Sequence, residues 1–392
     1  MKLLYFADTR FPIERANGAQ TMATCQALAR RGHAVTLYVR PDTASPQRDP
    51  FEFYDLPRTD GLTITYMSAP LGERWRRANF LLSAAIVAGR SRDTLVYTRD
   101  LGLASFLTQL PSLRRPKIVY ESHGIAPVVS RELPELLGKP ELAASPRKLD
   151  RLDRRERRVW KRAPAYVTIT RALADDLAER YGPRPNVFIV PDAAAARAGS
   201  SPVPFHRTPL AGYAGHLYPW KGVDIFVRAL AAAPGVRGLI VGGHPGEGDR
   251  ARVETIAREC GVTDRLEITG LIPQRDVAAR LAAATMLVLP NIASTISERY
   301  TTPLKLFEYL WLGLPIVASD LASIREILQP ERTALLVPPG DAHALGDAMT
   351  RLASDPALSS SLGTAARALA GDYTWERRAE RLEPAIEAAA RA

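Results

Sequence analysis

Short apolar runs, many of them rich in β-branched residues, alternate with stretches of helical periodicity along most of the chain. In the first half these runs predict strands at residues 3–7, 35–39, 62–66, 95–98, 118–121, 167–170 and 187–190. In the second half they predict strands at residues 210–214, 238–241, 266–269, 286–290, 316–318 and 335–337. Strands that alternate with helices are typical of parallel sheets, so the pattern predicts an α/β fold.

The alternation of predicted strands and helices is interrupted once, at residues 192–209, where the sequence DAAAARAGSSPVPFHRTP is rich in Ala, Gly, Ser and Pro. This composition is typical of a linker between domains. A chain of 392 residues is too long for one ordinary core and suits two domains of similar size. We expect an N-terminal domain at 1–195, a C-terminal domain at 205–372 and a final helix at 373–392. No segment approaches the ~20 apolar residues that span a bilayer, which favours a cytoplasmic protein.

The chain is basic, with 52 Lys+Arg against 42 Asp+Glu and a formal charge of +10. Such a charge is compatible with anionic substrates, a membrane surface or nucleic acid. The most basic run, residues 147–162, has a helical pattern with Leu149, Leu152 and Val159 inward. This pattern favours a helix with a solvated basic face over a site that binds RNA or lipid. Residues 74–81 combine an aromatic and apolar cluster with arginines, and they are the better candidate for peripheral membrane contact.

Two cysteines, Cys25 and Cys260, are too few for a disulfide framework. They also lack the spacing of metal ligands, so we expect a reducing compartment and no zinc site.

The strongest candidate for chemistry lies at residues 301–319, TTPLKLFEYLWLGLPIVAS. Thr301, Thr302 and Pro303 predict a helix start, because hydroxyls cap free N–H groups and proline suits the first helical position. Glu308 is the single acid among the apolar residues of this helix. A buried carboxylate needs a fixed polar partner, which a ligand hydroxyl would supply. Gly313 then ends the helix.

A second candidate lies at residues 212–229, GYAGHLYPWKGVDIFVRA, where a strand opens into a glycine turn. Lys221 precedes a helix that begins near Gly222. An ammonium beside helix N–H groups would bind a diphosphate. The competing interpretation of Lys221 is a solvated surface lysine.

Three further motifs fall in the first half. His123 in VYESHG follows a strand at the sheet end where α/β folds bind ligands, and Glu121 on the same strand face would orient its imidazole. Gly18, in an Asn17–Gly18 turn before a helix, would admit a substrate to the backbone. Arg99 is a candidate substrate contact. A purely structural histidine, an ordinary strand-helix turn and a salt bridge are the respective alternatives.

The order and spacing of these motifs, along nearly the whole chain, resemble the retaining glycosyltransferases of family 4. Their GT-B fold has two Rossmann-like domains with parallel sheets facing a cleft that binds a nucleotide-sugar. The resemblance implies metal-independent transfer of a hexosyl-type group from a nucleotide-diphospho-sugar, without a cofactor. It also implies that the final helix packs back on the N-terminal, acceptor-side domain.

The resemblance assigns roles to individual positions. Glu308 would hold the ribose, and Lys221 would contact the diphosphate together with the helix start at Thr302, Pro303 and Leu304. His123 would lie near the reacting sugar. Further donor contacts are implied for backbone or side-chain positions at Gly18, Gly215, His216, Gly243 and Ile272.

Two positions depart from the family pattern. An arginine usually follows the turn glycine, but here Gly215 is followed by His216. A second glutamate usually stands eight residues before the first, but here that residue is Tyr300, and whether Tyr300 or the nearby Glu298 replaces it is open.

Family frequency favours a UDP-sugar over GDP-mannose. The acceptor, whether glycan, lipid-linked or small molecule, is unidentified, and no nucleic-acid partner is expected.

Two alternatives compete with this interpretation. A non-hydrolysing nucleotide-sugar epimerase would use the same fold and phosphate contacts, and the basic charge fits a non-catalytic protein that binds nucleic acid or membranes. Neither explains the joint occurrence of GHLYPWKG and TPLKLFEY at the family spacing.

Overall fold

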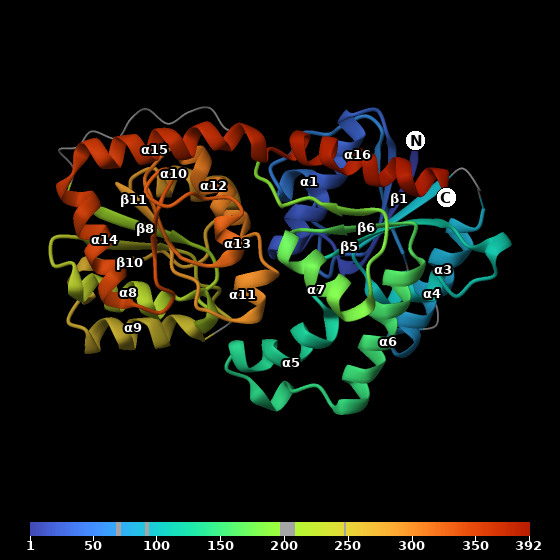
Figure 1. The fold of residues 1–392 in the computed structure, drawn as a ribbon, viewed down its shortest axis with the longest axis horizontal. Helices are drawn as coiled ribbons and strands as arrows, with labels where there is room; N and C mark the ends of the chain where they lie inside the picture. The colour runs from blue at the N-terminus through green and yellow to red at the C-terminus, as the bar shows by residue number, and fades with distance from the viewer. Residues whose placement is uncertain (68–71, 91–93, 197–207, 247) are drawn as a thin grey trace. The chain divides into compact units, whose positions relative to one another are not determined.

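The computed structural model describes residues 1–67, 72–90, 94–196, 208–246 and 248–392 (Figure 1). The chain forms two compact units. The first comprises Met1–Arg131, Ala144–Asp192 and Trp375–Ala392, and the second comprises Glu132–Ala143 and Ala193–Thr374. Of the predicted linker, residues 197–207 lie outside the described residues.

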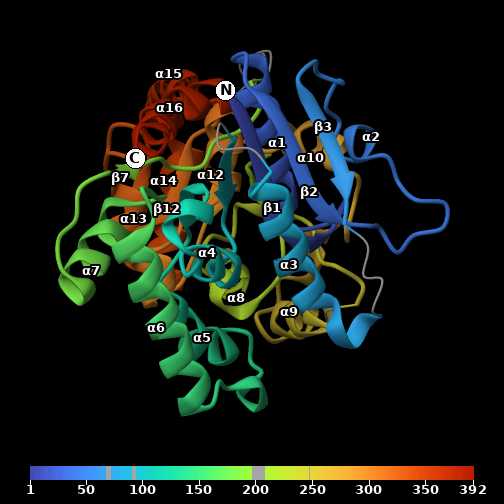
Figure 2. The same cartoon turned by 90° about the vertical axis from the view of Figure 1, so that its right-hand side faces the viewer.

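The first unit contains a seven-stranded parallel sheet in the order β3-β2-β1-β4-β5-β6-β7. Its strands are β1 (Lys2–Arg10), β2 (Ala34–Arg40), β3 (Leu62–Tyr66), β4 (Thr94–Thr98), β5 (Lys117–Ser122), β6 (Ala165–Thr168) and β7 (Val187–Ile189). The associated helices are α1 (Ala16–Arg30), α2 (Pro50–Phe53), α3 (Arg76–Ala88), α4 (Leu101–Leu107), α5 (Ala126–Leu136), α6 (Pro146–Arg162), α7 (Arg171–Tyr181) and α16 (Trp375–Arg391). Helix α4 contacts both α3 and α6 (Figure 2).

The second unit contains a six-stranded parallel sheet in the order β10-β9-β8-β11-β12-β13. Its strands are β8 (Leu210–Ala214), β9 (Arg237–Val241), β10 (Leu266–Ile268), β11 (Met286–Leu289), β12 (Ile316–Ser319) and β13 (Leu335–Val337). Its helices are α8 (Val223–Ala232), α9 (Asp249–Glu259), α10 (Gln274–Leu281), α11 (Thr295–Arg299), α12 (Leu304–Leu312), α13 (Ala322–Arg325), α14 (Ala342–Ser354) and α15 (Pro356–Ala370). Every predicted strand overlaps an observed one, which confirms the α/β class.

Both faces of each sheet are buried, as parallel sheets require. On β11, Val288 packs into one apolar cluster while Leu287 and Leu289 pack into another, because successive side chains of a strand point to opposite faces. In the first unit, Leu382 and Ile386 of α16 share a cluster with β1 and α1. The last helix therefore packs on the sheet of the first unit, across β5, β6 and β7 (Figure 1).

The basic helix α6 has an exposed face with arginines and a buried face with one acid. Val159 is buried on its inner side, while Arg151 and Arg154 are exposed, in agreement with the predicted solvated face. Glu156 is also buried, which the sequence did not predict. Its carboxylate accepts hydrogen bonds from Tyr166 Oη at 2.7 Å and from the Ala126 N–H at 3.0 Å, and burial raises its pKa to about 7.

None of the described helices is both long and apolar enough to cross a bilayer.

Candidate functional site

Two glycine turns meet at the carboxyl ends of β8 and β9. Gly215 has a φ of +123° and its N–H donates to Val241 O at 2.9 Å, while Gly242 has a φ of +146°. A Cβ added to Gly242 would lie 2.1 Å from Gly215 O, so no side chain fits there. The next residue, Gly243, is also left-handed, with a φ of +105°. Glycine is needed here because the two backbones touch in a conformation that other residues rarely adopt.

Lys221 lies directly after the β8 turn, at the end of a short 3-10 turn, Pro219–Lys221. Gly222 follows with a φ of +72° and begins α8; a Cβ there would lie 1.6 Å from Pro290 O. The Lys221 ammonium is 3.4 Å from the centroid of the Trp220 ring, and its burial lowers its pKa to about 7. Lys221 is half-buried, which disfavours its interpretation as a solvated surface lysine.

A second lysine, Lys305, reaches the same turn from α12. Its Nζ lies 3.8 Å from the centroid of the Tyr213 ring and 3.1 Å from where a Cβ of Gly215 would be. This Nζ is buried and has no hydrogen-bond partner among the described residues. Burial lowers the pKa of Lys305 well below its ordinary value, and the nearby charge of Lys221 lowers it further, against the opposing effect of Glu308.

Glu308 lies one helical turn after Lys305 on α12 and is half-buried. Its Oε1 accepts a hydrogen bond from Gln274 Nε2 at 3.1 Å. Gln274 begins α10, directly after the segment that contains Ile272, a half-buried residue packed against the core. The structure thus brings Glu308 to the segment predicted to border a base. Sequence reasoning missed Gln274.

The start of α12 differs from the prediction. The helix begins at Leu304 with Pro303 as its N-cap, and no side chain caps its first turn. The Thr301 hydroxyl instead donates to Ile296 O at 2.7 Å, and Thr302 is buried. The predicted hydroxyl cap was therefore wrong. The first N–H groups of the helix lie at the positive end of its dipole. Gly313, with a φ of +65°, ends the helix as predicted.

His216 occupies the position where the family resemblance implied an arginine. Its ring stacks on Tyr218, with 4.9 Å between the centroids and 2° between the planes. Its carbonyl accepts a hydrogen bond from Tyr213 Oη at 2.7 Å. Of the two candidates for the missing glutamate, Tyr300 is buried and Glu298 on α11 is half-buried.

In the first unit, His123 forms part of a buried polar network after β5. Its Nε2 lies 2.5 Å from Glu121 Oε1, as their shared strand face predicts. Glu121 is fully buried and also accepts from Arg378 Nη2 of α16 at 2.7 Å and from Gln20 Nε2 at 2.8 Å. Burial would raise the pKa of Glu121, but Arg378 and His123 outweigh it and hold it well below its usual range. Burial and the charge of Arg99 lower the pKa of His123, against the opposing hydrogen bond with Glu121.

One group of residues in this network has ligand types suited to a metal. Ligand atoms of Glu121, His123 and Asp192 all lie within 4.8 Å of one another. The Arg378 guanidinium, however, donates to Glu121 and lies 3.8 Å from Asp192. It supplies the positive charge that a metal would bring, so this donor set does not fit a cation.

Gly18 and Arg99 both contact other residues of the first unit. Gly18 lies within the first turn of α1, so the prediction of a turn at Asn17–Gly18 was wrong. A Cβ on Gly18 would lie 2.3 Å from Tyr54 Oη and 2.6 Å from Ile13 Cγ2, and glycine is needed for this packing. Arg99 donates a hydrogen bond to Gln20.

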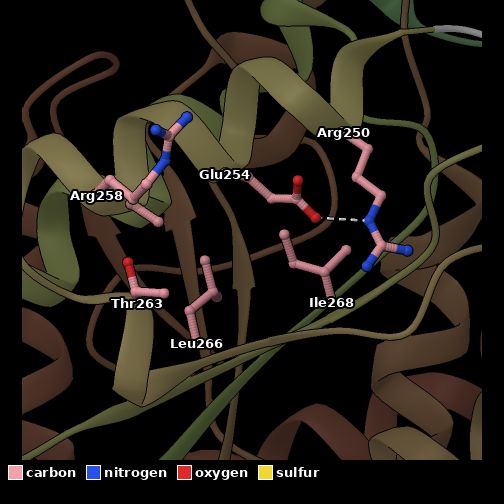
Figure 3. Close-up of a pocket in the computed structure, with 7 residues that line it drawn as sticks. Arg250, Glu254, Arg258, Thr263, Leu266 and Ile268 are labelled. Atoms are coloured by element: carbon pink, nitrogen blue, oxygen red, sulfur yellow. Dashed lines mark hydrogen bonds and ion pairs between the residues drawn. The ribbon is translucent and has the colours of Figure 1, made fainter.

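A surface hollow of about 330 Å³ lies apart from these residues (Figure 3). Arg250, Glu254 and Arg258 of α9 line it together with Leu266 and Ile268 of the edge strand β10. Arg250 Nε and Glu254 Oε1 are paired at 2.7 Å within it. None of the candidate residues lines this hollow. The glycine turns, where the candidate residues of the second unit lie, are therefore the better candidate for the functional site.

Two family models match the chain. The one described as "Glycosyl transferase 4-like domain" matches residues 17–193, and the one described as "Glycosyl transferases group 1" matches residues 208–355. Together they cover every strand of the two sheets except β1.

Curated relatives include a D-inositol 3-phosphate glycosyltransferase of Xylanimonas cellulosilytica, 28% identical over 239 residues, which are 56% of this chain and 56% of the relative. A 2-deoxystreptamine glucosyltransferase of Streptomyces kanamyceticus is 27% identical over 219 residues, 52% of this chain and 54% of the relative. The chain spans about half the length of these relatives.

Solved structures resemble the chain over nearly its whole length. Sucrose-phosphate synthase of Thermosynechococcus elongatus has a TM-score of 0.78 at 19% identity, covering 98% of each chain. The Anabaena protein HepE, in complex with UDP and glucose, has a TM-score of 0.74 at 16% identity, covering 99% of each chain. At these identities the likeness concerns the fold alone.

Proposed function

Because the chain belongs to the GT-B glycosyltransferases with family 4-like domains, we propose that it transfers a hexosyl-type group from a nucleotide-diphospho-sugar to an acceptor hydroxyl. The anomeric configuration is retained and no metal takes part. One observation carries this proposal: Lys221, the glycine turn at Gly215 and the start of α12 lie together in the second unit, with Glu308 on the same helix.

Each part of this site has a role. The Lys221 ammonium and the N–H groups at Leu304 and beyond neutralise the diphosphate, because ammonium charge and helix dipole act in the same sense. Gly215 and Gly243 allow the phosphates to approach the backbone closely. Glu308 accepts hydrogen bonds from the ribose hydroxyls.

In the reaction, the bond between the anomeric carbon and the diphosphate oxygen breaks, and a bond from the acceptor oxygen forms on the same face of the sugar. The acceptor proton passes to the departing diphosphate. Charge therefore develops where Lys221 lies, and a fixed cation there lowers the barrier. His123, in its neutral form, donates or accepts a hydrogen bond at a sugar hydroxyl.

UDP-sugars are the first donors to examine, since HepE binds UDP and glucose in the same fold. A thermal-shift screen of nucleoside diphosphates selects the base, and donor hydrolysis assays then select the sugar. Lys221→Met and Glu308→Gln are each expected to reduce turnover at least about 100-fold. Lys139→Met is the matched control, because Lys139 is an exposed lysine of the same unit.

Two outcomes contradict the proposal. Near-wild-type turnover in folded Lys221→Met and Glu308→Gln rejects the assigned roles. Epimerised donor in NMR spectra recorded without acceptor supports the epimerase instead.

The predicted membrane cluster at residues 74–81 was wrong in part, because Phe80 is buried and Arg76 and Arg77 pair with Asp8. We also propose that α3 mediates peripheral contact with an anionic membrane through other residues. Trp75, Leu82 and Ile86 are 57%, 55% and 60% exposed, and their spacing places them on one face of the helix and the turn before it. Arg74 and Arg90 are exposed at the two ends of this face. Apolar side chains flanked by cations suit the headgroup region of anionic lipids.

A further inference from the structure

The ammonium group of Lys305 lacks a compensating polar partner. Its Nζ is buried without a hydrogen-bond partner among the described residues, and its main contact is the face of the Tyr213 ring at 3.8 Å. A cation over an aromatic face recovers only part of the free energy that an ammonium group loses when it leaves water. The arrangement is therefore unfavourable by itself.

The neighbouring charges increase this cost. Lys221 lies close enough to repel Lys305, and Glu308, the carboxylate that attracts it, already accepts a hydrogen bond from Gln274 at 3.1 Å. Tyr213 and Tyr309, which lie on β8 and α12, have raised pKa values and stay neutral. Two adjacent lysines at a glycine turn, one of them with a buried Nζ that lacks a polar partner among the described residues, form a site that an anion with at least two charges would complete.

The arginine expected after the turn glycine is absent, and the His216 ring in its place is stacked on Tyr218. Lys305 approaches the same turn from α12, with its ammonium 3.1 Å from where a Cβ of Gly215 would be. The side chain thus supplies a cation at the turn from a different element of the fold.

We propose that Lys305 is a second diphosphate-binding residue of the donor site, acting with Lys221 on the two phosphates of a nucleoside diphosphate. This assignment rests on the proposed function. Glycine at position 215 is part of it, since its φ of +123° disfavours other residues and a Cβ there would crowd the ammonium at 3.1 Å. The start of α12 then contributes both backbone N–H groups and a side-chain cation to the same ligand.

The test measures folding and binding in one set of variants, with UDP as the probe and GDP if the wild-type protein prefers it. Lys305→Met keeps the length of the side chain and removes its charge. Because it removes a buried amino group that lacks a polar partner among the described residues, we expect its melting temperature without ligand to equal or exceed that of the wild type. Its affinity for UDP should be at least about tenfold weaker, while its affinity for uridine is unchanged.

Calorimetry in two buffers of different ionisation enthalpy gives a second readout at pH 8. Wild-type protein takes up protons when UDP binds, because the diphosphate favours the charged form of both lysines, and Lys305→Met takes up fewer. Lys139→Met, which alters an exposed lysine of the same unit, should match the wild type in every measurement.

The outcomes separate this assignment from the function on which it rests. Wild-type protein that binds neither UDP nor GDP contradicts the donor site and the role of Lys305 together. Wild-type protein that binds UDP, with the same affinity and proton uptake in Lys305→Met, contradicts the role of Lys305 alone. A folded Lys305→Met with a lower melting temperature and undiminished UDP binding indicates a structural lysine.

Discussion

Lys221 and Lys305 both have pKa values below the ordinary value of about 10.4 for a lysine, that of Lys221 being about 7. Without ligand, a large fraction of this site is uncharged at neutral pH. A diphosphate restores the charge, because its oxygens replace the water that the ammonium groups lost. Binding of the donor is thereby linked to proton uptake.

The first prediction concerns the pH dependence of UDP binding. The free Lys221 loses its proton above pH 7, so binding at higher pH requires proton uptake. Affinity should therefore fall between pH 7 and 9, by up to about tenfold per pH unit for each proton taken up. The diphosphate stays fully ionised in this range, since the second phosphate pKa is about 6. Calorimetric titration measures the effect, uridine serves as the uncharged control, and a flat UDP profile would contradict the linkage.

The second prediction concerns Glu156, whose pKa is about 7 because of burial. A carboxyl with a raised pKa contributes stability below its unfolded pKa of about 4.3, and this contribution is lost as the pH rises through 7. Glu156→Gln resembles the protonated form and removes this loss. The melting temperature of Glu156→Gln relative to wild type should rise from pH 5 to pH 8. A constant difference across that range would refute the shifted pKa.

Among individual residues, the sequence indicated Lys221 and Glu308 as donor-site candidates but did not indicate Lys305. In the sequence, LKLFEY is a short amphipathic helix, and a lysine within it has the pattern of a surface residue. One signal was available: Lys305 and Glu308 are three positions apart and share a helix face. Gln274 gave no such signal, because its contact with Glu308 depends on how α10 packs beside α12.

Among the elements, the last helix carries a residue that completes the network around His123. Arg378 of α16 is 1% exposed and donates to Glu121 at 2.7 Å and to Thr24 Oγ1 at 3.1 Å. The helix thus contributes charge compensation to the first unit in addition to its apolar face.

The third prediction follows from this contact. Arg378→Met removes the buried guanidinium that pairs with the buried Glu121 carboxylate, which should lower the free energy of unfolding by about 3–5 kcal/mol. The adjacent Arg377 pairs with Glu380 at the surface, so Arg377→Met should cost less than about 1 kcal/mol. Urea unfolding of both variants measures the difference. Equal effects of the two substitutions would show that Arg378 does not compensate Glu121.

Strands were predicted more accurately than helix starts. Apolar, β-branched runs define strands almost alone, because both faces of each parallel sheet are buried. The start of a helix depends on tertiary contacts as well. Thr301 bonds Ile296 O instead of capping α12, and Gly18 packs under Tyr54 and Ile13 instead of forming a turn. Both motifs have a composition typical of the predicted cap and turn, but contacts with residues outside the motif determine the local structure that forms.

For the whole molecule, the basic charge and the exposed face of α3 lead to a fourth prediction. Wild-type protein should sediment with phosphatidylglycerol vesicles and not with phosphatidylcholine vesicles, since arginines and apolar residues act together at an anionic surface. The double substitution Trp75→Ser and Leu82→Ser should weaken this binding at least about tenfold. Leu113→Ser alters another exposed leucine of the same unit and is the control. Equal binding of all three proteins would exclude α3 as the contact.

At the same scale, the two-unit organisation follows from the sequence, since one linker separates two series of strands. The identity of the acceptor does not follow. Residues 43–57 and 126–146 carry no motif with recognisable ligand chemistry, and a hydroxyl acceptor needs only shape and a few hydrogen bonds, which leave no regular spacing in a sequence.

The most direct measurement is a crystal structure of the protein with the nucleoside diphosphate that stabilises it most. We expect the diphosphate within hydrogen-bond distance of the Lys221 ammonium and of the N–H groups at the start of α12, and the ribose hydroxyls on Glu308. A nucleotide bound elsewhere, for example in the hollow between α9 and β10, with Lys221 and Glu308 untouched, would contradict it.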